Sequence, residues 1–471
     1  MIKMLVPGLM FVSGCSELEV EEQEWSAEPI LLTISVHGHN YGLDTTGDEV
    51  EARREERYDA HQTELLWLAE LAESEGMLLS VQINGEYALD AIRYDDTAHL
   101  HDLLDTGHEL SVHFHRFLLE PGGSGWLEYE ANEASESWVR QTWADHVAAF
   151  EAAVGQAPLR VDAATGIDTP AQLALLDALE VEYGIEVSHN LGERLSYTPW
   201  NIKPLTPYRR AAGTYTGSDP EGQSITTSAL GQISQEPPQG HHAIYSAPDQ
   251  IRRHLLVLEA ERRQQALSGS DEIVWQFGVM THLDLNAANR LPVESLIREL
   301  GALTRLDGLA EPATDSLVLE RFETWEAAHP GEVAFSFDWD GWLAGDDVDL
   351  PYALEGVICG LKDTEYRRTI APADGVNGVA LSGRAITREP LDELGFPGEM
   401  AVGEALGPVY LLWSDRVHTA TIDFSPQLSG TLWVMDGASG EVTTQDAEHL
   451  EVKATPIVVT RDPALLTGCD L

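Results

Sequence analysis

The chain has 471 residues, and 43% of them are hydrophobic, so it is long enough for two to four domains with sizeable cores. It carries 79 acidic residues against 28 basic ones, a formal net charge of −51. A surface of that sign repels nucleic-acid phosphates and anionic lipid headgroups, which argues against nucleic acid or a charged membrane surface as a partner.

The N-terminus has the layout of an export signal. Lys3 precedes a short apolar run, and small residues follow in "VSGC", residues 12–15. This stretch resembles the lipobox of bacterial lipoproteins, whose cysteine is lipidated after cleavage. The resemblance implies a signal peptide over 1–14, lipidation of Cys15 and an acidic tether over 15–29. We therefore expect an exported protein of the bacterial cell envelope, at the outer membrane or facing the periplasm, that contacts a membrane through this lipid anchor only. An ordinary signal peptide is the alternative.

Two further cysteines remain, Cys359 and Cys469. An exported compartment permits disulfides, so these two residues are candidates for a bridge. Two buried free thiols are the alternative.

From residue 28 onwards, short apolar runs alternate with stretches of helical spacing. Strands are expected over 28–38, 77–89, 108–117, 157–166, 185–191 and 273–285. Helices are expected over 49–76, 97–107, 134–155, 169–184, 249–267 and 291–303. This alternation predicts an α/β domain over 30–305, a distorted (β/α) barrel of about seven parallel strands. A helical linker is expected over 306–335. Short runs divided by turn residues then predict an all-β sandwich over 336–471.

Two pairs of histidines stand near the ends of expected strands. His37 and His39 occur in "SVHGHN", and His113 and His115 occur in "SVHFH". Residues two apart on a strand share a face, and the carboxyl ends of parallel strands meet at one rim. Imidazole is a common ligand of divalent metals, zinc above all. The four histidines therefore predict a site for one or two divalent ions, most simply Zn²⁺, with surface or supporting roles for one pair as the alternative.

The stretch "GHELSVH", residues 107–113, resembles a motif of the polysaccharide deacetylase family, carbohydrate esterase family 4. That family's motif reads Gly-His-Glu-Ile-Gly-Asn-His, and its last histidine binds the metal, which implies this role for His113. The family's second metal histidine falls at Phe117 here, so His115 is the candidate instead. The family's Thr-Phe-Asp-Asp-Gly motif aligns with "LTISVHG", where Ser35 and Val36 replace the two aspartates. His37 and His39 then become candidate ligands.

Two later segments extend the resemblance, which covers about residues 28–303. "LRVDAATG" is similar to the family's Arg-Pro-Pro-Tyr-Gly segment, so Arg160 is expected to orient a carboxylate base. "GVMTHL" is similar to its Leu-x-His motif, which implies that His282 protonates the leaving group. The base itself stays open among Asp44, Glu86 and Asp162; Asp162 is preferred because it shares a strand face with Arg160. The implied reaction is metal-dependent hydrolysis of an acyl group, most simply N-acetyl, on a carbohydrate.

Aromatic residues in and near the long loops over 191–271 are candidates for sugar binding. Trp200 and Tyr208, with Trp275 nearby, have apolar rings that suit a sugar face, and core packing is the alternative for each.

Two other functions fit part of the pattern. An amidohydrolase-type metal barrel explains His37 and His39 better and would add His189, His282 and Asp284, but it leaves "GHELSVHFH" unexplained. A lipid-anchored carbohydrate-binding protein without catalysis is supported by the missing aspartate pair. Metal content and acetate release separate the three.

Overall fold

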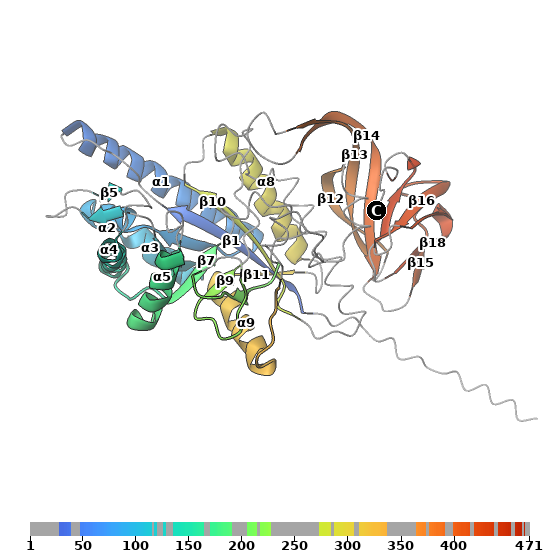
Figure 1. Cartoon of the computed structure of the whole chain (residues 1–471). Helices are drawn as coiled ribbons and strands as arrows, with labels where there is room; N and C mark the ends of the chain where they lie inside the picture. Colours follow the sequence, from blue (N-terminus) through green and yellow to red (C-terminus); the bar gives the residue numbers. More distant parts are fainter. Residues whose placement is uncertain are drawn as a thin grey trace, which may run out of the picture.

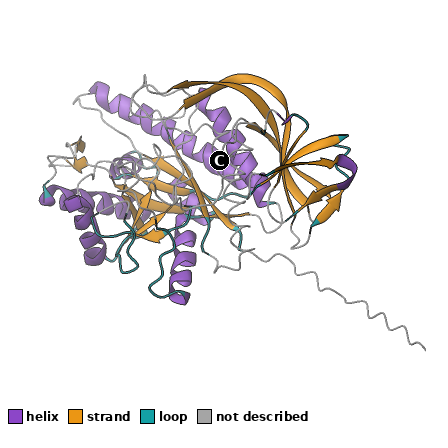
Figure 2. Ribbon diagram, turned by 45° about the vertical axis from the view of Figure 1, so that its right-hand side comes forward, coloured by secondary structure: helices purple, strands orange, loops and turns teal. Residues whose placement is uncertain are grey.

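A computed structural model gives the fold of the chain. It describes residues 28–38, 48–114, 117–119, 126–128, 135–163, 170–190, 205–213, 217–227, 273–283, 287–305, 310–336, 364–373, 376–390, 399–414, 419–437, 441–453, 457–463 and 466. The described residues up to 336 form a mixed α/β part, and an all-β part follows it, with helix α8 (Ala287–Thr304) on the side where the two meet (Figure 1). Figure 2 shows the same division by secondary structure.

The α/β part is built on a parallel sheet, which confirms the expected fold class. Nine strands follow the order β10-β1-β2-β3-β6-β7-β9-β8, with β11 also pairing with β1. Within the described residues, every ladder of this sheet is parallel except that between β8 and β9. The strands are β1 (Ile30–Gly38), β2 (Ser80–Ile83), β3 (Glu109–Phe114), β6 (Arg160–Ala163), β7 (Glu186–Asn190), β8 (Tyr208–Arg209), β9 (Ile225–Thr227), β10 (Gln276–His282) and β11 (Ala310–Ala313).

The two ends of this sheet approach each other without a described ladder between them. The amide of Gln276 on β10 donates to the carbonyl of Leu205, which lies just before β8, at 2.9 Å. Among the described residues the sheet is therefore a curved, mainly parallel sheet, and this backbone bond brings its two ends together.

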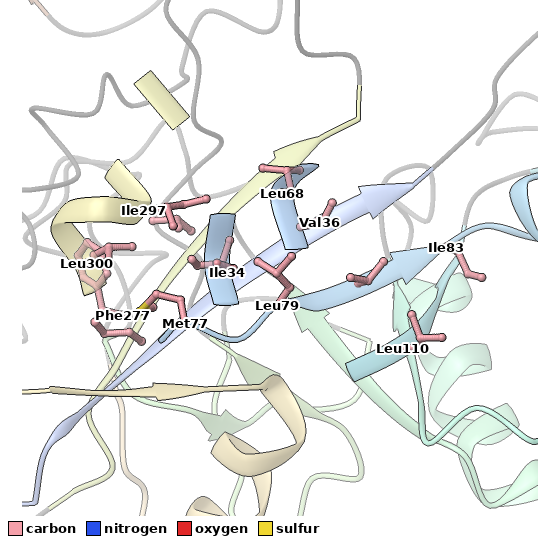
Figure 3. Packing of buried hydrophobic residues seen from close by; sticks show 14 of the residues in the cluster. Ile34, Val36, Leu68, Met77, Leu79, Ile83, Leu110, Phe277, Ile297 and Leu300 are labelled. Carbon is pink, nitrogen blue, oxygen red and sulfur yellow. The ribbon is translucent and has the colours of Figure 1, made fainter. Parts of the chain in front are cut away.

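Strand β1 shows how the sequence sets the two faces of the sheet. Ile34 and Val36 point to the outer face and pack with residues of other strands and helices, including Leu68, Ile297 and Leu300 (Figure 3). Thr33, Ser35 and His37 alternate with them and are buried on the inner face. Each fully buried apolar side chain of the outer cluster contributes roughly 1.5–3 kcal/mol relative to exposure. The apolar half of β1 thus anchors the strand, and the polar half is left to line the interior.

Helices surround the sheet, and the last of them begins at Asp315 against its inner face. They are α1 (Asp48–Glu75), α2 (Gly85–Arg93), α3 (Ala98–Asp105), α4 (Glu136–Val154), α5 (Pro170–Tyr183), α8 (Ala287–Thr304) and α9 (Asp315–Ala328). Helix α4 illustrates their boundaries: the side chain of Ser135 accepts a bond from the amide of Trp138, and Gly155 ends the helix with φ of 77°. A short hairpin of β4 (Phe117–Leu119) and β5 (Trp126–Glu128) precedes it.

The expected strand over 77–89 is only half right. Strand β2 ends at Ile83, and α2 begins directly after it. The side chain of Asn84 accepts a bond from the amide of Tyr87 and so caps the N-terminus of α2. This cap ends the strand earlier than the apolar pattern predicts.

The segment over 306–335 is not a linker, contrary to expectation. Its strand β11 pairs in parallel with Ile30–Thr33 of β1, below the part of the same edge that β2 occupies. Helix α9 then starts inside the domain, and the backbone amide of Asp315 donates to the hydroxyl of Ser80 at 2.9 Å. This segment therefore completes the α/β domain instead of joining it to the next.

The all-β part contains a six-stranded antiparallel sheet of order β12-β13-β14-β19-β16-β17 and a two-stranded sheet of β15 and β18. The strands are β12 (Thr364–Ala373), β13 (Val376–Pro390), β14 (Glu399–Ser414), β15 (Ala420–Ile422), β16 (Thr431–Asp436), β17 (Val442–Asp446), β18 (Leu450–Val452) and β19 (Ile457–Thr460). Buried residues of both sheets, such as Leu412, Ile422 and Val452, form one core. The structure thus has two unequal sheets where a sandwich was expected.

The larger sheet is apolar on both faces. Tyr410 and Leu412 of β14 face the core shared with the small sheet, whereas Val409, Leu411 and Trp413 belong to the core of the α/β domain. This explains why "VYLLW" is a continuous apolar run. Among the described helices, none is long and apolar enough to cross a membrane.

Candidate active site

Three histidines from three strands meet on the inner side of the parallel sheet. His37 is the second-last residue of β1, His113 is the second-last of β3, and His282 is the last of β10. The ring centroids of His37 and His113 are 4.1 Å apart, and those of His37 and His282 are 4.9 Å apart. Residues far apart in sequence are thus brought to the carboxyl edge of the sheet, where parallel folds build sites.

The strand register explains this convergence. His37 is paired with His282 in the ladder between β1 and β10, and with Gln82 in the ladder between β1 and β2. The rings of His37 and His113 are fully buried, whereas His282 is partly exposed. Among the three histidines, His282 is therefore the one in contact with solvent.

The two buried imidazoles fit a divalent ion in donor type and in closeness to each other. Among the side chains that the structure describes, however, no set of three or more His, Cys, Asp or Glu residues is arranged to hold a metal. The other two expected ligands, His39 and His115, lie outside the described residues.

Below the imidazoles lies a buried ion cluster. The guanidinium of Arg160 on β6 pairs with the carboxylate of Glu109 and lies 3.4 Å from Asp315 Oδ2. Glu109 also accepts a bond from the amide of Ser316 at 2.8 Å. Arg160 thus contacts Glu109 and Asp315, whereas the side chain of the expected base, Asp162, lies outside the described residues. Neither partner was a candidate from the sequence.

Burial sets the electrostatics of this cluster. Burial raises the pKa of the Asp315 carboxyl, and the neighbouring Arg160 guanidinium opposes that rise. One cation faces two carboxyl groups in this cluster. A buried set of this kind is costly unless it is paired and hydrogen-bonded.

Both missed residues had signals in the sequence. Glu109 alternates with Ser111 and His113, so all three share the inner face of β3. Asp315 follows Thr314, whose side chain caps α9, in a segment that we treated as a linker. Only the pairing of β11 with β1 brings Asp315 under the sheet.

Glu86 is a second unusual carboxyl group at the carboxyl end of β2. It is 5% exposed, and its Oε2 atom makes no hydrogen bond within the described part of the chain. Burial and then the nearby Asp90 raise the pKa of Glu86 to about 8, against the opposing effect of Arg54, Arg57 and Arg93. The amide of Asn84, two residues earlier, donates to the carbonyl of Gly38 at 2.9 Å. Such a carboxyl can exchange a proton near neutral pH.

The positions of the family's two aspartates carry no acid here. The hydroxyl of Ser35 donates to Asp315 Oδ2 at 3.4 Å, and Val36 is buried in the outer apolar cluster. Asp162 is the register partner of His113 in the ladder between β3 and β6.

Tyr208 was expected to offer a face to a sugar, and the structure contradicts this. The side chain is 1% exposed, and its ring packs 5.3 Å from that of Phe335. Burial raises the pKa of its phenol far above the usual range. Trp275 is buried as well, so both rings belong to the core.

Several other expectations fall outside the described residues. They concern Trp200, Asp44, Asp284, Cys15, Cys359 and Cys469. The side chain of His189 is also outside, although its backbone belongs to β7.

No protein-family model and no curated protein matches this chain. Solved structures that resemble it include a probable polysaccharide deacetylase from Pseudomonas aeruginosa, with 13% identity, a TM-score of 0.39, and coverage of 65% of this chain and 93% of that one. An allantoinase has 12% identity and a TM-score of 0.39, with coverage of 64% and 92%. A family 4 carbohydrate esterase from Streptomyces lividans, in complex with acetate, has 10% identity and a TM-score of 0.31, with coverage of 66% and 99%. Likenesses this distant assign neither a substrate nor a residue role to this chain.

Proposed function

We propose that this chain is a metal-dependent hydrolase that removes acyl groups, most simply N-acetyl, from a carbohydrate. The observation that carries the proposal is the convergence of His37, His113 and His282 from three separate strands. The motif "GHELSVH" and the order of the later motifs add the resemblance to polysaccharide deacetylases.

A divalent ion, Zn²⁺ in the simplest case, would be held by His37 and His113, with His39 and His115 as the further donors. When bound, such an ion acidifies water and stabilises negative charge on an acyl oxygen. The remaining chemistry falls to side chains of the chain itself.

His282 is the proposed acid. It is the most exposed of the three histidines, and its ring stands edge-on to that of His37, so it borders the buried pair on the open side. A histidine there can give its proton to a departing amine. Asp162 remains the proposed base, because the register of β3 and β6 pairs it with His113. Glu86, with its raised pKa, is the alternative carboxyl.

Arg160 has a supporting role in this scheme. Its guanidinium contacts Glu109 and Asp315, so it stabilises the buried cluster beneath the imidazoles. Orientation of the proposed base, Asp162, is its second proposed role. Four further parts of the proposal come from the sequence. They are substrate recognition by Trp200, a lipid anchor at Cys15, a location in the cell envelope, and a bridge between Cys359 and Cys469.

The test is an acetate-release screen on acetylated glycans, with metal content measured on the same samples. The native chain should release acetate, and His282→Ala should retain metal but lose activity. A parallel panel of amides and esters without sugars tests the amidohydrolase alternative. Sugar binding without release of any acyl group would instead favour a binding protein.

A further inference from the structure

Much of the inner face of the sheet beneath the imidazoles is polar, which is unusual for a parallel fold. Such interiors are normally filled by branched apolar side chains. Here Ser35, Ser80, Gln82, Ser111 and Arg160 lie under the imidazoles, and each is at most 3% exposed. We call these five side chains the polar column. Buried polar groups cost free energy unless they are hydrogen-bonded, so the partners of the polar column indicate its role.

Asp315 organises the lower end of the column. Its Oδ2 atom accepts bonds from Ser35 Oγ at 3.4 Å and from Gln82 Nε2 at 3.5 Å, and it lies 3.4 Å from Arg160 Nη2. Its backbone amide donates to Ser80. The start of α9 therefore fixes one side chain or more on each of β1, β2 and β6.

Gln82 links this lower end to the imidazoles. Its Nε2 atom is held by Asp315, which directs the amide oxygen away from that carboxylate. In the register of β1 and β2, Gln82 lies opposite His37, and strands so paired are about 4.8 Å apart. Within the described part of the chain, Gln82 Oε1 is buried and makes no hydrogen bond. The amide oxygen of Gln82 is therefore a buried acceptor, close to the imidazoles, that has no donor among the described residues.

We propose that Gln82 is a positioning residue whose amide oxygen accepts the ring N–H of His37, and that Asp315 fixes the orientation of that amide. The inference rests on the proposed function, because it takes His37 as a ligand in the imidazole site. A ligating histidine almost always donates its other ring N–H to an acceptor, which sets its tautomer and orientation. In this proposal Gln82 supplies that acceptor, and the bond from its Nε2 atom to Asp315 leaves the amide oxygen, not the nitrogen, for the ring.

Ser111 provides a matched control on the neighbouring strand. Its hydroxyl is also buried and makes no hydrogen bond within the described residues, and it is paired with Gln82 in the ladder between β2 and β3. Within the described residues Ser111 Oγ does not bond to Asp315, so removal of this hydroxyl should not be coupled to Asp315.

The experiment measures Zn²⁺ affinity of the whole chain by competition with a chromophoric chelator, together with the nitrogen NMR shifts of the His37 ring. Gln82→Met, which keeps the length but removes the amide, should weaken Zn²⁺ binding by about 10- to 100-fold and shift the His37 tautomer. Asp315→Asn should weaken binding less. The double variant Gln82→Glu with Asp315→Asn should restore affinity, because an amide at 315 can donate to a carboxylate at 82. Ser111→Ala should behave additively with Asp315→Asn.

The outcomes separate this inference from the proposed function. If the native chain binds Zn²⁺ and Gln82→Met binds it equally well with unchanged His37 shifts, the positioning role is refuted and the metal site stands. If the double variant binds no better than Asp315→Asn alone, the link through Asp315 is refuted. If the native chain binds no Zn²⁺, the metal-dependent function is refuted, and equal His37 shifts in the native chain and Gln82→Met would then refute the positioning role as well.

Discussion

His37 and His282 lie opposite each other in the parallel ladder of β1 and β10, with their rings edge to face at 4.9 Å. The buried ring of His37 also lies beside that of His113, whereas His282 is partly exposed. His37 therefore belongs to two pairs. With His113 it forms a buried pair that suits an ion, and with the partly exposed His282 it forms a pair that suits proton transfer. This division leads to the first two predictions.

Replacing His113 with alanine should remove bound metal. The purified native chain is expected to carry about one or two zinc-like ions, because the proposed ligands are rich in imidazole. Elemental analysis of native protein and His113→Ala measures the change. His101→Ala, at an exposed histidine of α3, is the control and should keep the native content. Equal metal in all three proteins would contradict a role for His113.

Replacing His282 with alanine should lower turnover on an acetylated glycan by about 10²–10⁴-fold while metal stays bound. The reason is that the departing amine loses its proton donor, whereas His37 and His113 remain in place. Acetate release and metal content are measured together, with His449→Ala at an exposed position of the all-β part as the control. Unchanged acetate release would remove His282 from the reaction.

Glu86 should make stability depend on pH. Burial raises its pKa to about 8, so the folded state favours the protonated carboxyl. The contribution of the protonated Glu86 to the free energy of unfolding is fully present below the ordinary pKa near 4.3, and it is lost as the pH rises towards about 8. Between pH 5 and 8, the unfolding free energy of the native chain should therefore fall by up to about 4 kcal/mol more than that of Glu86→Gln.

Urea unfolding of the two proteins at several pH values checks this expectation. Glu151→Gln, at an exposed glutamate of α4, should keep the native pH dependence and serves as the control. Parallel curves for the native chain and Glu86→Gln would show that the carboxyl is ionised in the fold at neutral pH.

Arg160→Met should destabilise the fold by about 3–5 kcal/mol, because it leaves Glu109 and Asp315 buried without their cation. The urea midpoint measures the loss. Arg140→Met breaks exposed pairs with Glu136 and Glu182 and should leave the midpoint essentially unchanged. If the two variants have the same urea midpoint, the buried cluster of Arg160, Glu109 and Asp315 does not stabilise the fold.

Cys15→Ser should release the chain from membranes, because the lipobox-like stretch "VSGC" ends at this cysteine. Fractionation of cells that produce the native and the variant chains, followed by detection of the protein, measures the effect. A variant that stays with the membrane fraction as the native chain does would exclude an anchor at Cys15.

Local patterns in the sequence were enough for the parallel sheet and for its inner histidines. Period-2 alternation in "ILLTISVHG" and "HELSVHFH" puts His37 and His113 on one face of each strand, because successive side chains on a strand must point to opposite sides. The same alternation assigned Ile34 and Val36 to the apolar side. These features follow from residues within one element, so a single sequence contains them.

Tertiary structure alone decided which groups lie beneath those histidines. The pairing of β11 with the lower half of β1 brings Asp315 under Gln82 and Arg160, although a linker was expected there. Tertiary packing also buries Tyr208, whose amphipathic ring suits a core as well as a sugar site. Long-range strand pairing and burial depend on the whole packed chain, and no local spacing of residues encodes them.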